Sequence, residues 1–150
     1  MNRDVLSSLI SDFILKNKII PFAIGFVLSF DQDDNPEVLI GICQDKEMKT
    51  WKKQYGGDAK YYIWNVAEYD IFEHESLYID IKQWADMNSR EEYIDYFCNS
   101  LPSIKTSIDA NTGYTPYLFA HDLDDDDING FLDKSLSNEE IDSLKKGLLL

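Results

Sequence analysis

The apolar residues near the start of the chain recur with a helical period. They occupy positions 5, 6, 9, 10, 13 and 14, and residues three and four apart share one face of a helix. This spacing predicts an amphipathic helix that ends near Asn17. A nearly continuous apolar segment follows at residues 20–30. It predicts a buried strand, because the segment contains Pro21 and Gly25 and is too short to span a membrane as a helix.

A polar turn and a second apolar segment come next. Residues 31–36 are rich in Asp and Asn and end in a proline, and residues 38–43 are again apolar. The two apolar segments therefore predict a β-hairpin with a polar tip. Residues 46–55 predict a short helix with Met48, Trp51 and Tyr55 on one side and lysines on the other, closed by Gly56 and Gly57. The aromatic run at residues 61–64 predicts a third strand.

Two capping boxes mark helices in the second half of the chain. Ser89, followed three residues later by Glu92, opens a helix that Pro102 is expected to end. Ser137, followed by Glu140, opens the last helix. The apolar positions 141, 144, 148 and 149 of this last segment are expected to face inward.

Two further segments are less regular. Residues 77–85 fit both a strand and a helix, and we favour the helix. Residues 114–120 predict a strand, which Pro116 places at a sheet edge or in an irregular segment. This order of elements predicts an α+β fold, with a small, mainly antiparallel sheet packed against helices. No linker or repeat divides residues 1–150, so a single globular domain is expected.

Charge is the strongest feature of the composition. The chain has 28 acidic and 14 basic residues, a formal net charge of −14. Such a charge repels nucleic acids and anionic membranes, so neither is an expected partner, and a cationic protein is favoured. The first residues do not form a signal peptide, and Cys43 and Cys98 are too few for a disulfide framework. A cytoplasmic location is therefore expected.

The acidic residues form two groups in the sequence. Residues 68–95 contain nine acidic residues and two basic ones, and residues 109–142 contain ten acidic residues and one basic one. Runs of this kind are commonly solvated surfaces, and that interpretation stays open. The alternative is a surface that steers a basic protein toward the chain. Its candidate contact residues are Asp122, Asp124, Asp125, Asp126, Asp127, Asp70, Glu73 and Glu75.

The densest acidic segment also resembles a calcium-binding loop. Asp125, Asp127, Asn129, Gly130 and Asp133 fit positions 1, 3, 5, 6 and 9 of an EF-hand. The bidentate Glu needed at position 12 is replaced by a leucine, and no incoming helix is predicted. We therefore favour an acidic connector and expect no metal or cofactor. Divalent-metal (calcium) binding by the loop from Asp125 to Asp133 is the alternative function.

Motifs for catalysis are missing from the sequence. His74 and His121 are the only histidines, and their spacing to Cys43 and Cys98 does not indicate a catalytic dyad. Both cysteines are expected in the core. No zinc-hydrolase, phosphate-loop or nucleophile-elbow motif occurs, and carboxylates are too numerous for any pair to stand out. We therefore do not expect an enzyme, and assign no catalytic residues.

The segment Trp-Asn-Val-Ala-Glu-Tyr at residues 64–69 has two interpretations. Its aromatic residues could anchor a partner, but burial in the core is favoured because so many large side chains need cover. Together with the N-terminal helix and the hairpin, Trp64, Glu68 and Tyr69 resemble a family of small bacterial immunity-type proteins found with polymorphic toxins and contact-dependent inhibition systems. The family usually has Trp where Tyr69 stands, and the acidic tail after Asp109 has no counterpart in it.

The resemblance implies a function but assigns no residues. It implies a cytoplasmic immunity (antitoxin) protein that binds and neutralises a cognate toxin domain, often a basic nuclease. An acidic surface suits this role, because it mimics the charge of a nucleic acid and accelerates association with a basic domain.

Overall fold

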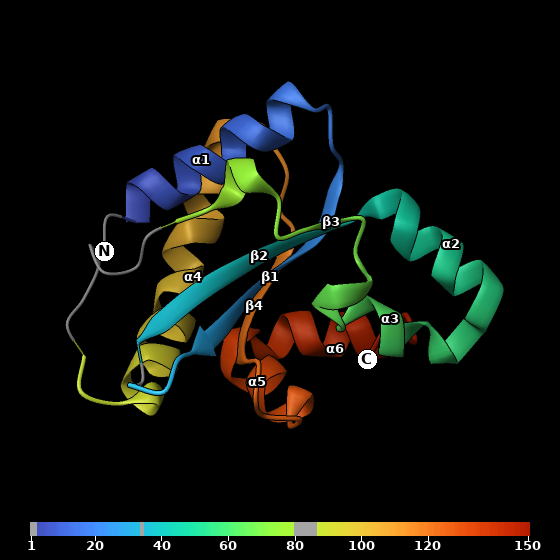
Figure 1. The fold of residues 1–150 in the computed structure, drawn as a ribbon. Helices are drawn as coiled ribbons and strands as arrows, with labels where there is room; N and C mark the ends of the chain where they lie inside the picture. The colour runs from blue at the N-terminus through green and yellow to red at the C-terminus, as the bar shows by residue number, and fades with distance from the viewer. Residues whose placement is uncertain (1–2, 34, 80–86) are drawn as a thin grey trace.

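A mixed sheet lies at the centre of the structure, a computed structural model that describes residues 3–33, 35–79 and 87–150. Its strands are β1 (Pro21–Phe30), β2 (Pro36–Gln44), β3 (Ile71–Phe72) and β4 (Tyr117–Asp122), in the order β3-β2-β1-β4 (Figure 1). The β1–β2 and β2–β3 pairs are antiparallel, whereas β4 runs parallel to β1. The predicted α+β fold and hairpin are confirmed, and the parallel pair makes the sheet mixed.

Two long helices, α1 (Arg3–Lys16) and α4 (Arg90–Thr112), cover one face of this sheet (Figure 1). Leu6 and Ile10 of α1 and Phe97 of α4 are almost completely buried there. The Phe97 ring lies 5.9 Å from the ring of Phe26 on β1. We call this side the helix-covered face.

Shorter elements cover the other face. They include α2 (Asp45–Tyr55), α3 (Lys60–Ile63), α5 (Ile128–Ser135) and α6 (Asn138–Lys146), together with the 3-10 turns η1 (Gly56–Ala59) and η2 (Val66–Glu68). Another 3-10 turn, η3 (Glu75–Leu77), follows β3. Trp64, Phe119 and Leu144 belong to a second apolar cluster on this side. We call it the cleft face, for the hollow described below.

The central strands present side chains of different size to the two faces. Toward the helix-covered face they present large residues, namely Ile24, Phe26, Leu28, Val38, Ile40 and Ile42. The alternate positions, which belong to the cleft face, are smaller on average: Ala23, Gly25, Val27, Leu39, Gly41 and Cys43. Because successive side chains of a strand point to opposite faces, this alternation lets the backbone of other segments approach the cleft face closely.

The helix caps follow the sequence closely. The Ser137 hydroxyl accepts the N–H of Glu140, and the Glu140 carboxylate accepts the N–H of Ser137, as a capping box requires. Ser89 accepts the N–H of Glu92, but the Glu92 carboxylate binds the N–H of Asn88 instead of closing the box. Of the helices described, none combines the length and apolar character needed to cross a membrane.

The prediction of a strand at residues 61–64 was wrong. These residues form most of α3 and its C-terminal end, and the chain enters α3 directly from the turn η1. Ile63 and Trp64 are both buried, while Tyr61 is 68% exposed. Two consecutive buried residues do not show the strict alternation of a half-buried strand. Aromatic residues are common in strands because they pack well on the surface of a sheet. Here Trp64 is buried from the end of a helical turn, so the preference did not predict a strand correctly.

The expected end of a helix at Pro102 was also wrong, since α4 continues to Thr112. A proline inside a helix removes one backbone hydrogen bond and favours a break. Leu101, Ile104 and Ile108 are buried on both sides of the proline, and this packing stabilises the continuous helix.

Three smaller expectations have different outcomes. Leu148 is 68% exposed and not inward, whereas Ile141, Leu144 and Leu149 are buried as predicted. Of the helix favoured at residues 77–85, Leu77 ends the 3-10 turn η3 and Tyr78 is extended, whereas residues 80–86 lie outside the described part of the chain. The segment with Pro116 is an edge strand, as predicted, and β4 begins just after the proline.

Candidate functional site

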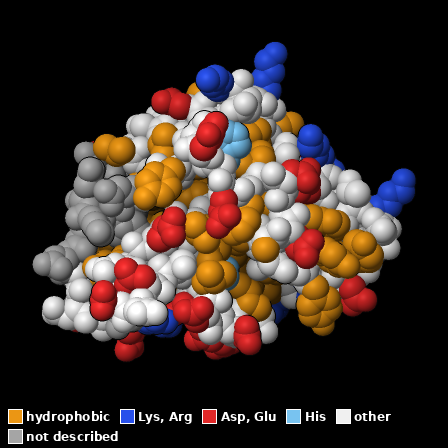
Figure 2. All heavy atoms as spheres, viewed as in Figure 1, with side chains coloured by type: hydrophobic (Ala, Val, Ile, Leu, Met, Phe, Trp, Pro, Cys, Tyr) orange, Lys and Arg blue, Asp and Glu red, His pale blue; other side chains and the backbone are white. Residues whose placement is uncertain are grey.

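A cleft of about 730 Å³ opens on the cleft face of the sheet. Apolar side chains, an imidazole and charged groups of both signs line it. The apolar lining includes Val27, Trp64, Val66, Phe72 and Leu132. Figure 2 shows hydrophobic side chains in the middle of the viewed face of the molecule, with separate carboxylates scattered around them. The size and lining are typical of a site that binds a ligand or a few side chains of a partner.

The turn η2 forms part of the cleft because two glycines let it sit directly on the sheet. Gly25 and Gly41 face each other across the β1–β2 pair. A Cβ atom added to Gly25 would lie 2.4 Å from the Val66 side chain, and one added to Gly41 would lie 2.2 Å from it. Both distances are impossible for real atoms. These glycines are therefore required by the close approach of Val66.

Two buried aromatic side chains fix the segment that carries η2. The Trp64 indole N–H donates to the carbonyl oxygen of Leu149 at 2.7 Å, which ties the segment to the chain beyond α6. The Tyr69 hydroxyl donates to the carbonyl oxygen of Ile63, and burial is the main reason that the pKa of Tyr69 is raised. The prediction that these aromatics belong to the core is confirmed. Glu68, between them in sequence, is exposed.

Glu47 is a buried carboxylate that the sequence analysis missed. It is 9% exposed and accepts the backbone N–H of Gln44 and that of Asp70, both at 3.2 Å. It thereby caps α2 and joins this helix to the segment before β3. The N-cap position before Glu47 is occupied by Gln44 and not by Ser, Thr, Asp or Asn, so the usual capping signal is missing from the sequence.

The loop at residues 122–127, which we call the acidic loop, is held by hydrogen bonds between its aspartate side chains and nearby backbone N–H groups. Asp122 accepts the N–H of Asp124 at 2.9 Å, and Asp125 accepts the N–H of Asp127 at 2.9 Å. Asp127 then caps α5 by accepting the N–H of Gly130 at 3.1 Å. Side chains that bond their own backbone in this way fix a turn. The loop therefore presents its carboxylates in a defined geometry.

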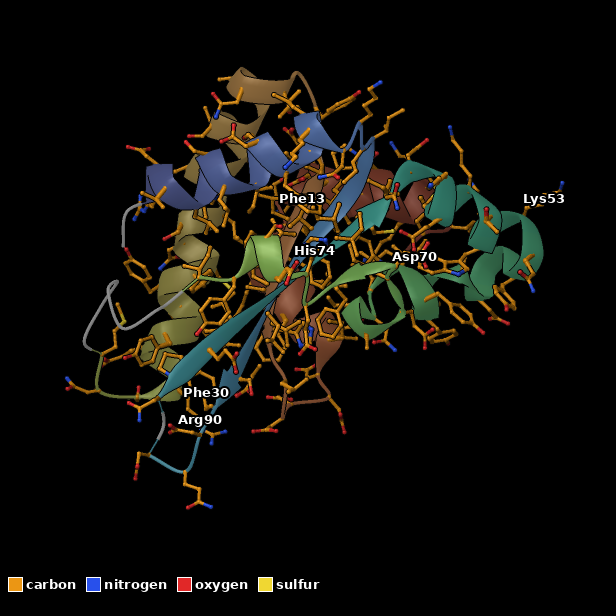
Figure 3. All side chains as sticks on the ribbon, turned by 45° about the horizontal axis from the view of Figure 1, so that its top comes forward. Phe13, Phe30, Lys53, Asp70, His74 and Arg90 are labelled. Atoms are coloured by element: carbon orange, nitrogen blue, oxygen red, sulfur yellow. The ribbon has the colours of Figure 1, made fainter. Side chains whose placement is uncertain are left out.

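The charge of the acidic loop is largely unbalanced. Among the described residues, one ion pair to the loop is found, between Arg90 Nη1 and Asp124 Oδ2 at 3.2 Å, and both side chains are partly exposed. The Arg90 guanidinium also lies over the Phe30 ring, 5.0 Å from its centroid (Figure 3). Asp125 and Asp126 line the cleft. The structure thus places part of the predicted contact surface at the cleft.

The acidic loop does not continue as an EF-hand. Because Asp127 caps α5, the residues at the predicted positions 5 and 9, Asn129 and Asp133, lie on a helix. In the described part of the chain, no group of three His, Cys, Asp or Glu side chains is placed to hold a metal ion. The geometry gives the calcium alternative no support.

His121 lies in the cleft, although the sequence analysis did not select it as a site residue. It is paired with Val27 across the parallel strands, and its ring is parallel to that of Phe119, with centroids 6.1 Å apart. Burial lowers the pKa of the imidazole, while the carbonyl oxygen of Asp122, 3.1 Å from Nδ1, opposes the shift. The side chain is therefore neutral at pH 7. Its alternation with Phe119 along β4 was the signal that could have found it.

The second group of predicted contact residues lies elsewhere. Asp70, Glu73 and Glu75 are exposed and surround β3, which is at the opposite edge of the sheet from β4. Glu73 has a positive φ of 54°. In Figure 3, His74 of this segment lies beside Phe13 of α1, and their rings are 4.9 Å apart. The two acidic groups are therefore separate features of the surface.

The cysteines do not form a reactive site. Cys43 is 0% exposed and Cys98 is 6% exposed, so their predicted place in the core is confirmed. Burial is the main cause that raises the pKa of both thiols, and carboxylates near Cys43 raise its pKa further. A thiol that stays protonated is a poor nucleophile.

Fold and cleft together define the class of molecule: an acidic α+β domain with a charged cleft that has an apolar floor. Comparison with family models, with curated proteins and with solved structures found no match for the chain. The resemblance to immunity-type proteins therefore stays a prediction, and the functional argument depends on the geometry of the cleft and the acidic loop.

Proposed function

We propose that this chain is a cytoplasmic immunity-type protein that binds a basic toxin domain, such as a nuclease, and covers the toxin's substrate site. The observation that carries the proposal is the acidic loop. It has five carboxylates beside a cleft, of which three accept backbone N–H groups and a fourth has an ion pair within the described structure.

Charge and rigidity of the loop both favour protein binding. An excess of carboxylates accelerates the approach of a basic domain and orients it. A loop that is already ordered loses little conformational entropy when it binds, so more of the interaction energy contributes to affinity. The apolar floor of the cleft adds a place where a partner side chain can be buried, as in the centres of many interfaces.

The buried thiols favour binding over catalysis by cysteine. Both thiols are buried with raised pKa values, and the neutral imidazole of His121 packs against Phe119. The contact found for His121 Nδ1 is a backbone carbonyl oxygen.

The proposal can be tested by protection of cells. The chain is expressed together with a candidate basic toxin domain taken from a gene next to its own, and growth is measured. We expect growth to depend on the chain, and protection to fall when Asp124→Lys and Asp126→Lys are combined. The matched control combines Glu73→Lys and Glu75→Lys, which changes the net charge equally at the opposite sheet edge. Failure of the unchanged chain to protect the cells would contradict the proposal.

A further inference from the structure

The charged groups of the cleft lie on different elements according to their sign. The acidic ones, Asp125, Asp126 and Asp133, come from the acidic loop and α5. The basic ones, Lys60 and Lys145, come from α3 and α6. His121 of β4, which also lines the cleft, is neutral at pH 7, because burial lowers the pKa of its imidazole. The cleft therefore has an acidic side and a basic side over one apolar floor.

The carboxylates of the acidic side are available to a ligand. All three are exposed. The Asp125 side chain accepts one backbone N–H, from Asp127, which leaves further lone pairs on its two oxygens. The salt bridges found in the described residues do not include Asp125, Asp126 or Asp133. A cationic group entering the cleft would thus meet carboxylates that form no salt bridge with the lysines and arginines in the described part of the chain.

The floor next to these carboxylates is suited to an aliphatic chain. Leu123 is 50% exposed and Ile128 is half-buried, and both line the cleft and flank Asp125 and Asp126 in the sequence. A long side chain can bury its methylene groups on such a floor while its charged head reaches the rim. Apolar floor and acidic rim together fit a cationic side chain with a long stem.

We propose that the cleft binds an arginine-bearing segment of the partner protein. The guanidinium meets the carboxylates of the acidic side, the stem of the arginine lies on the floor, and backbone carbonyls of the same segment face Lys60 and Lys145. Arginine fits better than lysine because its planar head binds carboxylates through paired hydrogen bonds, is weakly hydrated and stacks on flat rings. This inference rests on the proposed function and specifies the contact that anchors the partner.

The inference can be tested without the toxin. The probe is the capped tripeptide acetyl-Leu-Arg-Ala-amide, added to the full chain while amide and indole N–H signals are followed by NMR. We expect saturable shifts at Trp64, Asn65 and Asn129, which line the cleft. The same peptide with citrulline keeps the shape but lacks the charge, and we expect it to bind about ten-fold more weakly, a difference near 1.4 kcal/mol.

Two variants give the test its controls. Asp126→Asn combined with Asp133→Asn removes two of the three negative charges from the cleft and should reduce the preference for arginine over citrulline several-fold. The matched change Asp142→Asn combined with Glu139→Gln removes two charges from exposed positions of α6 outside the cleft lining, and should leave the preference intact.

Other outcomes would overturn the inference. These are equal affinity for both peptides, shifts confined to the segment around Glu73 and Glu75, or no saturable shift at about 10 mM peptide. The protection test of the proposed function is independent of these results. If the chain protects cells but does not bind the peptide, the proposed function is supported and the arginine site is refuted. If the chain binds the peptide but does not protect cells, the arginine site is supported and the proposed function is refuted.

Discussion

Side chains on the two faces of the sheet differ in size, and the two faces are closed in different ways. On the helix-covered face, large residues such as Phe26 and Ile40 pack against Phe97 of α4 and the buried side of α1. On the cleft face, Gly25 and Gly41 let a 3-10 turn approach the strands directly. Two long helices cover the first face, while short elements leave a cleft on the second. The first face is thus suited to stability and the second to binding.

The largest effect on stability is expected on the helix-covered face. Phe97 is 1% exposed, so Phe97→Ala leaves a cavity and should lower the free energy of unfolding by about 3–5 kcal/mol. Urea unfolding measures this loss, provided that the slope of unfolding free energy against urea concentration is the same for the variant and the unchanged chain. Tyr61→Ala serves as the control, because Tyr61 is 68% exposed, and its effect should stay within about 0.5 kcal/mol. Similar losses for both variants would show that the packing of Phe97 on the sheet contributes little to stability.

A smaller effect is expected where the turn η2 meets the sheet. Gly41→Ala places a Cβ atom 2.2 Å from the Val66 side chain, and should cost about 1–3 kcal/mol through overpacking. Adding Val66→Ala should recover part of the loss, since it removes the opposing atoms. The matched control is Gly57→Ala, where a Cβ atom would meet nothing within 4 Å. If Gly41→Ala were as stable as the control, the close approach of Val66 would not require a glycine at position 41.

The smallest effect concerns pH and the cleft. Burial lowers the pKa of His121 below its usual value of 6.5, so the unfolded chain binds more protons in the window between the two pKa values. Stability contributed by neutral His121 is therefore present above 6.5 and lost as the pH falls through this window. His121→Gln should reduce the loss of unfolding free energy between about pH 7 and pH 5. An unchanged pH dependence would show that the imidazole is not held neutral by the fold.

Much of the fold could be predicted because its signals are local. The cap at Ser137, the hairpin turn and the helical spacing of α1 each depend on residues close in sequence. The strand at 61–64 was mispredicted because its aromatic residues are buried by long-range packing that includes the bond from Trp64 to Leu149. The end of a helix at Pro102 was mispredicted for the same reason. The packing of α4 against α1 and the sheet stabilises the helix by more than the one hydrogen bond that the proline removes.

The candidate site could be predicted only in part. A net negative charge and the run of aspartates were visible in the sequence, and Asp125 and Asp126 do line the cleft. The separation of Glu73 and Glu75 from them follows from the strand order, which no local signal encodes. The alternation of large and small residues along β1 was visible but was interpreted as a uniformly apolar strand.

The central claim is that the acidic loop, and not acidity in general, captures a basic partner. The measurement is the association rate constant with the toxin domain at low and at high salt, for two variants of equal net charge. Asp124→Lys with Asp126→Lys should slow association at least about ten-fold at low salt, and high salt should shrink the difference. Glu73→Lys with Glu75→Lys should have a much smaller effect. Equal slowing by both variants would show that bulk charge alone steers the partner, and would contradict the account.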